Sequence, residues 1–409
     1  MTGEMRPKLR HVQVSRGQQY GQHVLILSDP CGLSDCAMVL PASLAPVLEL
    51  CDGTRNIAAL RTGLELKTGL RVGPDYLERM FAALDRELLI DNEHYAQAYQ
   101  EALQKFRTAP SRPPTMADRV YPADSELLEQ VLCDYFDSLP PDTENMAKTG
   151  EVRGLVSPHI DYQRGGIVYA GVWHRAAKAA QDADVAIILG TNHFNGQKLV
   201  TLTRQSYTTP WGVLTTAGEV VDAVASAIGE KEVFAEEFNH RNEHSVEAAA
   251  VWLHYLAKDK GCELVPVLCG SFQRFIEGDR NPGDDGEVAR FIEALRKATA
   301  NRRTLIVAAG DLAHVGPAFG DRCPIDVLEK ARLSSADNEL MSAMARGDAE
   351  GMFQQVKKEA DRRRICGLSA IYLALRLLGK VSGDITGYAQ CPADEQGTSF
   401  VSICGIVLA

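Results

Sequence analysis

The run Asp184-Val-Ala-Ile-Ile-Leu-Gly190, which continues into Thr191-Asn-His193, decides the fold class that this sequence predicts. The run is almost continuously apolar, as expected for a strand that is buried on both faces of a parallel sheet. In an open α/β sheet, ligands bind outside the carboxyl ends of the strands. His193 stands directly after the predicted strand, so we expect it at the ligand-binding edge of the sheet.

Strands and helices alternate on both sides of this run. We predict further strands at Val152–Ser157, Cys262–Leu268, Thr304–Gly310, Gly383–Tyr388 and Ser399–Val407. The clearest helix is predicted to start with Ser245 as its N-cap, because apolar residues follow at helical spacing, at Val246, Ala249, Ala250, Leu253 and Leu256. This alternation indicates βαβ units and therefore an α/β fold.

A domain boundary is predicted near Arg107–Thr115, where three prolines and small polar residues are typical of a linker. We divide the chain into a small domain at 1–105, a linker at 106–120 and an α/β domain at 121–409. The small domain contains predicted strands at His23–Leu27, Ala37–Leu40 and Leu88–Ile90, helices at Leu44–Cys51 and Ile57–Thr62, and a helical stripe of Leu77, Met80, Phe81, Leu84 and Leu88. This order favours an α+β, winged-helix-like domain.

Composition and charge argue against several classes of protein. The chain has 43 basic and 54 acidic residues and a net charge of −11, so it lacks the charge pattern of a general nucleic-acid binder. No apolar run approaches the roughly 18 residues that span a bilayer, which argues against a membrane protein. Met1–Arg10 has no apolar core of a signal peptide, and the ten cysteines show no C-x-x-C spacing. We therefore expect a cytoplasmic protein with reduced thiols.

Four further motifs place polar side chains after a predicted strand or at a helix start. His159 follows a strand and Pro158, and His244 precedes the helix predicted from Ser245. The structural alternative for both histidines is a capping turn. Asp311 and His314 follow the strand at Thr304–Gly310. Their spacing would let the carboxylate orient the imidazole as a base or a metal ligand; a simple N-cap is the alternative for Asp311.

The fourth of these motifs is Ile365-Cys366-Gly367, before a predicted helix and after Arg362-Arg363-Arg364. A helix N-terminus with nearby arginines lowers the pKa of a thiol, which favours a thiolate as ligand or nucleophile. An inert, buried Cys366 is the alternative. If these motifs converge with His193, they form a metal-dependent active site.

The motifs occur in an order that resembles the MEMO family, whose fold is related to class III extradiol (LigB-type) non-haem iron dioxygenases. The resemblance covers about Tyr121 to Ala409. It rests on Ser157-Pro-His-Ile-Asp-Tyr162, Ile188-Leu-Gly-Thr-Asn-His193, Tyr207-Thr-Thr-Pro-Trp-Gly212, Glu243-His-Ser-Val-Glu247, Val265-Pro-Val-Leu-Cys-Gly270, Ala309-Gly-Asp-Leu-Ala-His314, Ile365-Cys-Gly367 and Gly387-Tyr-Ala-Gln390. It implies a central mixed sheet flanked by helices.

The resemblance also implies a metal site and a neighbouring pocket. The family's metal ligands fall on His159, His193 and Cys366, and its pocket acids and bases on Asp311 and His314, with His244 close by. A thiolate takes the place of the carboxylate of the related dioxygenases, which widens the choice of metal from iron to copper or zinc. The chain departs from the family pattern at Ile160, Asp161, Arg164 and Phe194, so its substrate is not implied.

The function expected from these residues is a non-haem Fe(II)-dependent oxidoreductase with a small-molecule or peptide substrate. A non-catalytic metal- or peptide-binding protein and a zinc hydrolase are the alternatives. Leu48–Ile57 and Leu84–Ile90 resemble PqqD-like domains, which recognise peptides in modification systems. The MEMO resemblance further implies radical-SAM and AMMECR-type partners.

Overall fold

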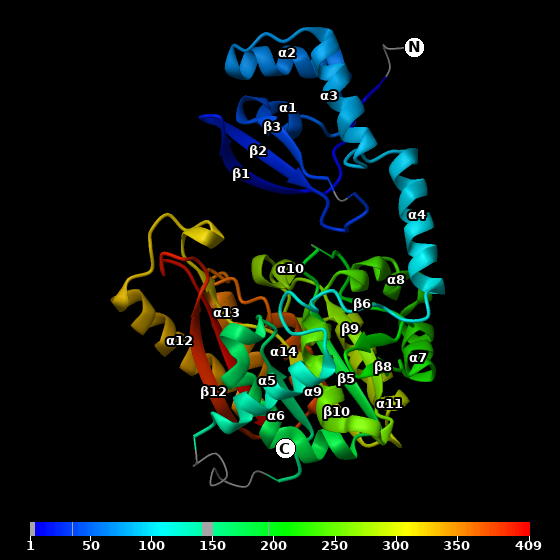
Figure 1. Cartoon of the computed structure of the whole chain (residues 1–409), viewed down its shortest axis with the longest axis vertical. Helices are drawn as coiled ribbons and strands as arrows, with labels where there is room; N and C mark the ends of the chain where they lie inside the picture. The colour runs from blue at the N-terminus through cyan, green and yellow to red at the C-terminus, as the bar shows by residue number, and fades with distance from the viewer. Residues whose placement is uncertain (1–4, 35, 141–149, 195) are drawn as a thin grey trace. The chain divides into compact units, whose positions relative to one another are not determined.

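The computed structural model describes residues 5–34, 36–140, 150–194 and 196–409. The chain forms two compact units, Met1–Thr108 and Ala109–Ala409 (Figure 1). Within the described residues, no helix combines the length and the apolar composition that crossing a membrane requires.

The first unit combines a small antiparallel sheet with helices. Its sheet has the order β1-β2-β3. The elements are β1 Gln13–Gln19, β2 Gln22–Ser28, β3 Met38–Pro41, a 3₁₀ turn at Ala42–Leu44, α1 Ala45–Glu49, α2 Ile57–Thr68, α3 Pro74–Arg86 and α4 Glu93–Thr108. The predicted stripe is confirmed for Leu77, Met80, Phe81 and Leu84, which are buried on α3. Leu88 lies beyond the helix at φ 56°, and the predicted strand at Leu88–Ile90 is only a single bridge between Ile90 and Leu9.

The second unit is built on a mixed sheet, as predicted. Among the described residues, eight strands form it, in the order β11-β13-β4-β10-β5-β9-β6, and β12 pairs with β13. Four central strands are parallel: β4 Gly154–Ser157, β10 Thr304–Ala309, β5 Val185–Thr191 and β9 Glu263–Cys269. The antiparallel strands are β6 Val200–Leu202, β11 His314–Val315, β12 Gly383–Pro392 and β13 Phe400–Leu408.

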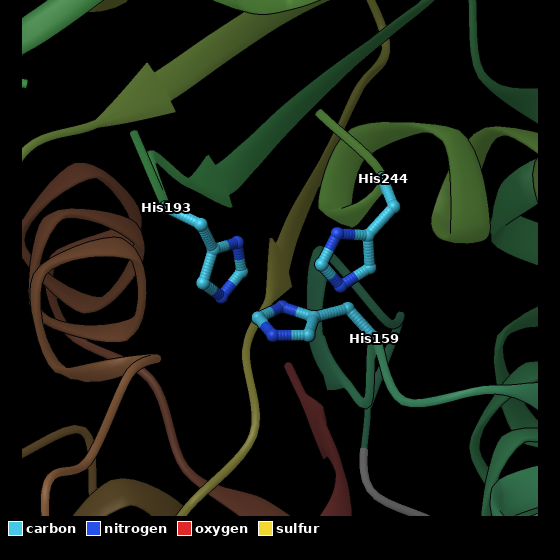
Figure 2. Close-up of side chains that lie close together, drawn as sticks. All are labelled: His159, His193 and His244. Carbon is cyan, nitrogen blue, oxygen red and sulfur yellow. The ribbon is translucent and has the colours of Figure 1, made fainter. Parts of the chain in front are cut away.

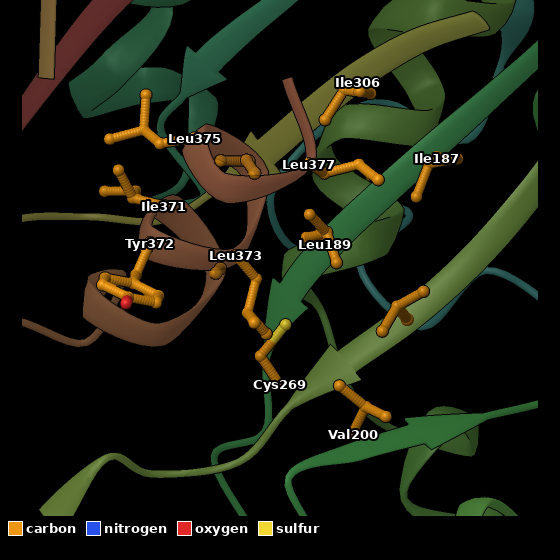
Figure 3. Close-up of a cluster of buried hydrophobic side chains, with 14 of the residues drawn as sticks. Ile187, Leu189, Val200, Cys269, Ile306, Ile371, Tyr372, Leu373, Leu375 and Leu377 are labelled. Atoms are coloured by element: carbon orange, nitrogen blue, oxygen red, sulfur yellow. The ribbon is translucent and has the colours of Figure 1, made fainter. Parts of the chain in front are cut away.

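Helices cover both faces of this sheet, which explains why β5 is apolar throughout. Ala186 and Ile188 face one layer, formed by α5 Ser125–Asp137, α6 Tyr162–Asp182 and α9 Ser245–Ala257. Ile187 and Leu189 face the other layer, formed by α7 Gly218–Ile228, α11 Gly286–Ala298, α12 Val327–Ala345, α13 Ala349–Lys358 and α14 Leu368–Leu378. Figure 3 shows Ile187 and Leu189 in one cluster with side chains of α14. The remaining elements are short: β7 Tyr207–Thr209, β8 Gly212–Leu214, α8 Glu230–Val233, α10 Gln273–Glu277 and 3₁₀ turns at Glu237–Arg241, Lys258–Lys260, Pro282–Asp284 and Pro317–Phe319.

The N-cap prediction for Ser245 is wrong by one residue. α9 does begin at Ser245, but His244 occupies the N-cap position. The Ser245 hydroxyl instead donates to the backbone oxygen of Thr191 at 3.0 Å, so it ties the helix start to the end of β5.

The segment predicted as a linker is largely held by the second unit. Arg112 is fully buried and forms an ion pair with Glu247 of α9 at 2.6 Å. The backbone N–H groups of Thr115 and Met116 donate to the same carboxylate, and Tyr121 also bonds to it. Residues 106–108 are the end of α4; from Ala109 on, the prolines keep the segment out of longer helices and strands, but they do not prevent it from packing.

Candidate metal centre

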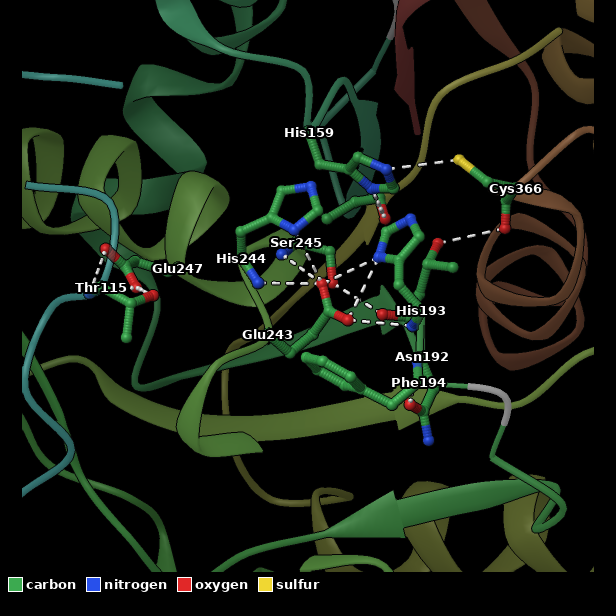
Figure 4. Close-up of polar contacts among 12 residues, drawn as sticks. Thr115, His159, Asn192, His193, Phe194, Glu243, His244, Ser245, Glu247 and Cys366 are labelled. Carbon is green, nitrogen blue, oxygen red and sulfur yellow. Dashed lines mark hydrogen bonds and ion pairs between the residues drawn. The ribbon is translucent and has the colours of Figure 1, made fainter. Parts of the chain in front are cut away.

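The residues predicted for a site converge at the carboxyl ends of adjacent strands. His159, Asp311 and His193 each stand two residues after the end of β4, β10 and β5, which are neighbours in the sheet. His244 is the residue before α9, and Cys366 lies two residues before α14. These segments enter the same region from different sides (Figure 4).

Three histidines form the centre of the site. The ring of His159 lies 5.0 Å from that of His193 and 5.2 Å from that of His244, edge to face in both cases. The rings of His193 and His244 are stacked at 4.8 Å (Figure 2). Among the described residues, two groups of potential ligands could hold a metal ion: His159, His193 and His244, and His159, Asp311 and Cys366.

His159 is oriented by a backbone oxygen. Its Nδ1 lies 3.0 Å from the carbonyl oxygen of Ala309, so Nδ1–H donates there and Nε2 faces the site. Nε2 lies 3.3 Å from Sγ of Cys366 and 3.7 Å from Oδ2 of Asp311. Burial alone would lower the pKa of His159, but Asp311 and Cys366 raise it to about 9. The surroundings of His159 therefore favour a positive charge at Nε2, which a metal ion also supplies.

His193 is oriented by a buried carboxylate, that of Glu243. Its Nδ1 lies 3.0 Å from Oε1 of Glu243, and its backbone N–H donates to Oε2 at 2.9 Å. The same carboxylate accepts hydrogen bonds from the backbone N–H groups of His244 and Ser245, at the start of α9. Burial would raise the pKa of Glu243, but His193 and His244 hold it well below its usual range. Metal-binding histidines characteristically have such a partner on the other ring nitrogen.

No role is predicted for Glu243 from the sequence, although it lies in the motif Glu243-His-Ser-Val-Glu247. The available signal was an acidic residue directly before a histidine at a predicted helix start. Backbone N–H groups are free at that position, so a carboxylate is favoured there. What the sequence did not show is that the carboxylate also reaches His193, 50 positions earlier in the chain.

The surroundings of Cys366 lower the pKa of its thiol, but through other groups than the arginines on which the prediction rests. Burial would raise the pKa of the Cys366 thiol, yet His159 and His314 hold it well below its usual range. The arginines that precede it point to other partners. Arg363 pairs with Asp337, and Arg364 pairs with Asp321. The prediction that these arginines activate the thiol is therefore wrong, and imidazoles take that role.

Two glycines allow the loops of Asp311 and Cys366 to meet. A methyl group at Gly310 would lie 2.5 Å from Cα of Gly367, and one at Gly367 would lie 2.8 Å from the backbone oxygen of Asp311. Gly367 N–H donates to that same oxygen at 3.0 Å. Any side chain at either position would force the two backbones apart.

The predicted pairing of Asp311 with His314 is wrong. Asp311 Oδ1 accepts from the backbone N–H of His159 at 2.8 Å, and the described contacts include no hydrogen bond from His314 to Asp311. Nδ1 of His314 lies 3.2 Å from the backbone oxygen of Arg364. The three-residue spacing brings side chains together in a helix, but residues 310–313 are not helical and His314 begins β11.

A cavity of about 340 Å³ adjoins the site and includes His193 and Cys366 in its wall. Two larger cavities of the second unit, about 790 and 740 Å³, include none of the predicted site residues. The smaller cavity is therefore the one that a ligand of these residues would occupy.

Comparison with known proteins points to one family. A family model described as Memo-like protein matches residues 112–407. A MEMO1 family protein of Aquifex aeolicus (strain VF5) is 25% identical over 414 residues, which cover 98% of this chain and 100% of the relative. MEMO1 family proteins of Methanosarcina mazei and Methanococcoides burtonii are 25% and 28% identical, over 66% and 68% of this chain and 88% and 95% of their own.

Proposed function

The chain belongs to the Memo-like protein family, and from this premise we propose that His159, His193 and Cys366 bind a metal ion. The observation that carries the proposal is the orientation of the two imidazoles. In each, Nδ1 is held by an outer acceptor, Ala309 O or Glu243, which leaves Nε2 for the metal. Cys366 adds a thiolate within 3.3 Å of His159 Nε2.

The donor set supports iron, copper or zinc. Two neutral imidazoles and one thiolate suit each of these metals, and three protein ligands leave coordination positions open. We propose Fe(II) as the metal and a non-haem, dioxygenase-like oxidation as the activity. Fe(II) would supply redox chemistry there, and the cavity beside His193 and Cys366 gives a small-molecule or peptide substrate access.

The chain's other residues then have distinct roles. Asp311 positions the His159 loop through the backbone N–H of His159, rather than acting on His314. His314 helps to lower the pKa of the Cys366 thiol. His244 stacks on His193 and contacts Glu243 through Nδ1 at 3.2 Å, so its Nε2 can bond to a substrate. We propose His244 and His314 as the acid–base groups of the reaction.

Metal analysis of the anaerobically purified full chain tests the ligand assignment. We expect about one metal per chain, and loss of most of it in His193→Ala and Cys366→Ser. His174→Ala and Cys323→Ser are matched controls, because both residues are exposed and outside the site. The assignment is wrong if both site variants keep their full metal content.

The identity of the metal and its reactivity test the activity. An Fe(II) form that gives the electronic spectrum of a nitric oxide adduct has an open coordination position, as the proposal requires. Zinc in the purified protein, with hydrolytic activity that survives strict anaerobiosis, would instead support a zinc hydrolase. Iron with no oxygen uptake across a panel of catechols would support a non-catalytic metal-binding protein.

We further propose that the chain works with radical-SAM and AMMECR-type proteins, and that its first unit, which resembles PqqD-like domains, recognises a peptide. The relative from Aquifex aeolicus matches 98% of this chain, so the match covers both units. This supports a shared role for the two units. Co-purification of the full chain with each partner type tests this proposal. If the chain forms a complex with neither partner, the proposal is contradicted.

A further inference from the structure

One carboxylate in the cavity beside the proposed metal site forms no salt bridge with the described residues. Asp361 lies in the wall of the 340 Å³ cavity, together with His193 and Cys366. Its Oδ1 accepts from the backbone N–H of Ile365 at 2.9 Å. The described residues show no salt bridge to Asp361 and no hydrogen bond to its Oδ2.

The neighbouring arginines do not neutralise this carboxylate, because each has an acid of its own. Arg363 pairs with Asp337 and Glu359, and Arg364, which also lines the cavity, pairs with Asp321. Among the described carboxylates, Asp361 is therefore the one in this cavity wall that forms no salt bridge, and Cys366, the other anionic group of the wall, is assigned to the metal. Burial raises the pKa of Asp361 to about 6, so the carboxyl is ionised at neutral pH at a cost in solvation.

The backbone around Asp361 is held in an uncommon conformation. Ala360, Asp361 and Arg364 have φ of 52°, 48° and 54°, in the left-handed region that costs free energy for residues other than glycine. Strained residues of this kind concentrate at ligand sites, where the surrounding structure holds them in place. Here the strained turn places a carboxylate in the cavity and leads directly into Cys366.

The volume of the cavity limits the size of its ligand. About 340 Å³ lies at the lower end of the range for small-molecule sites. Phe272 and Ile276 give one part of the wall an apolar surface, and Asn192, Ser271 and Gln273 add uncharged polar groups. Such a wall suits a short aliphatic chain that carries one charged end.

We propose that this cavity is the substrate pocket of the metal site, and that Asp361 binds the cationic end, an amine or a guanidine, of a small substrate. A cation at Oδ2 would form a charge-assisted hydrogen bond and offset the solvation cost of the half-buried carboxylate. The inference rests on the proposed function, because the pocket serves the reaction only if His193 and Cys366 hold the metal.

The variant Asp361→Asn tests the inference with little change to the turn. Asparagine can accept the hydrogen bond from Ile365 N–H and tolerates a positive φ, so it removes the charge alone. The probes are n-butylamine, 1-butanol and butyrate, which differ mainly in the end group. Their dissociation constants are measured by saturation-transfer NMR on the full chain, in metal-loaded and chelator-treated samples.

We expect wild-type protein to bind butylamine about tenfold more tightly than 1-butanol, since one charge-assisted hydrogen bond contributes about that factor. In Asp361→Asn the preference should disappear, while metal content stays at the wild-type level. Asp137→Asn, an exposed acid on α5, should keep the preference.

Equal binding of butylamine and 1-butanol to wild-type protein, a preference for butyrate, or an amine preference that survives in Asp361→Asn would each overturn the inference. The chelator-treated samples contain no metal, so they show whether Asp361 binds the amine independently of the metal-ligand assignment. Failure of this inference is therefore distinguishable from failure of the ligand assignment, which metal analysis of His193→Ala and Cys366→Ser decides.

Discussion

The variant Glu243→Gln tests whether the carboxylate at the start of α9 sets the metal-binding form of His193. Glu243 accepts from Nδ1 and the backbone N–H of His193, and from the backbone N–H groups of His244 and Ser245. Glutamine has the same shape but only one acceptor oxygen. If that oxygen stays at the Oε1 position, on the two N–H groups of α9, the NH₂ group replaces Oε2, which lies 2.9 Å from the backbone nitrogen of His193 and 3.1 Å from its Nδ1. The NH₂ group then competes with the oxygen for Nδ1, and where Nδ1 accepts from it, the ring proton moves to Nε2, the atom proposed to bind the metal.

The contacts of Glu243 set the expected losses of metal affinity and of stability in Glu243→Gln. Outer partners of metal-binding histidines change metal affinity by about 10- to 100-fold, which corresponds to about 1.4–2.7 kcal/mol. Glu243 also loses an acceptor for the backbone N–H of His193, which lies 2.9 Å from Oε2. Leaving this part-buried donor without a protein partner costs about 1 kcal/mol of unfolding free energy. We expect both losses in the same variant.

Competition with a chromophoric chelator measures the dissociation constant of the metal, and urea denaturation measures stability. Glu247→Gln is the matched control, because Glu247 is buried one turn further along α9 and its contacts are with Arg112, Thr115, Met116 and Tyr121. The control should lose stability and keep its metal affinity. If Glu243→Gln keeps the wild-type metal dissociation constant, Glu243 does not set the metal-binding form of His193 and serves only to cap α9.

Three further predictions follow from single contacts. Gly310→Ala should lower the metal content, because its methyl group would lie 2.5 Å from Cα of Gly367 and push the ligand loops apart; metal analysis at the wild-type level would contradict this. Arg112→Ala should lower the unfolding free energy by about 3–5 kcal/mol in urea, since it leaves Glu247 buried and uncompensated. Burial raises the pKa of Asp361 from 3.8 to about 6, so ionisation of this carboxyl lowers the free energy of unfolding. This loss of stability is absent below about pH 4, grows as the pH rises to about 6 and is complete above that pH. Asp361→Asn should therefore raise the unfolding temperature at pH 8 but not at pH 4, as scanning fluorimetry can check. An equal difference in unfolding temperature between variant and wild-type protein at both pH values would contradict this prediction.

The strands that the sequence predicted well are those with the most extreme composition. β5 and β10 are apolar along almost their whole length, because both of their faces are covered by helices, and each was located to within one residue at either end. β1, by contrast, is polar and mostly exposed, and it was not predicted. It exists because Tyr20 and Gly21, at φ 50° and 77°, form a tight turn that pairs Gln19 with Gln22.

The sequence by itself determined which polar residues reach the ligand-binding edge. His159, His193 and Asp311 stand two residues after three strands that are parallel, and parallel strands end at one edge of a sheet. The sequence also determined the family, through motifs in a fixed order.

Only the tertiary structure decided which polar groups contact one another. Glu243 bonds to the ring of His193, Asp311 bonds to the backbone N–H of His159, and imidazoles rather than arginines lower the pKa of Cys366. The physical reason is that hydrophobic periodicity fixes where a strand or helix ends, whereas the direction of a polar side chain depends on its nearest partner in space. Here the partners come from strands and helices that are 50 to 207 positions apart in the chain, brought together by the order β4-β10-β5.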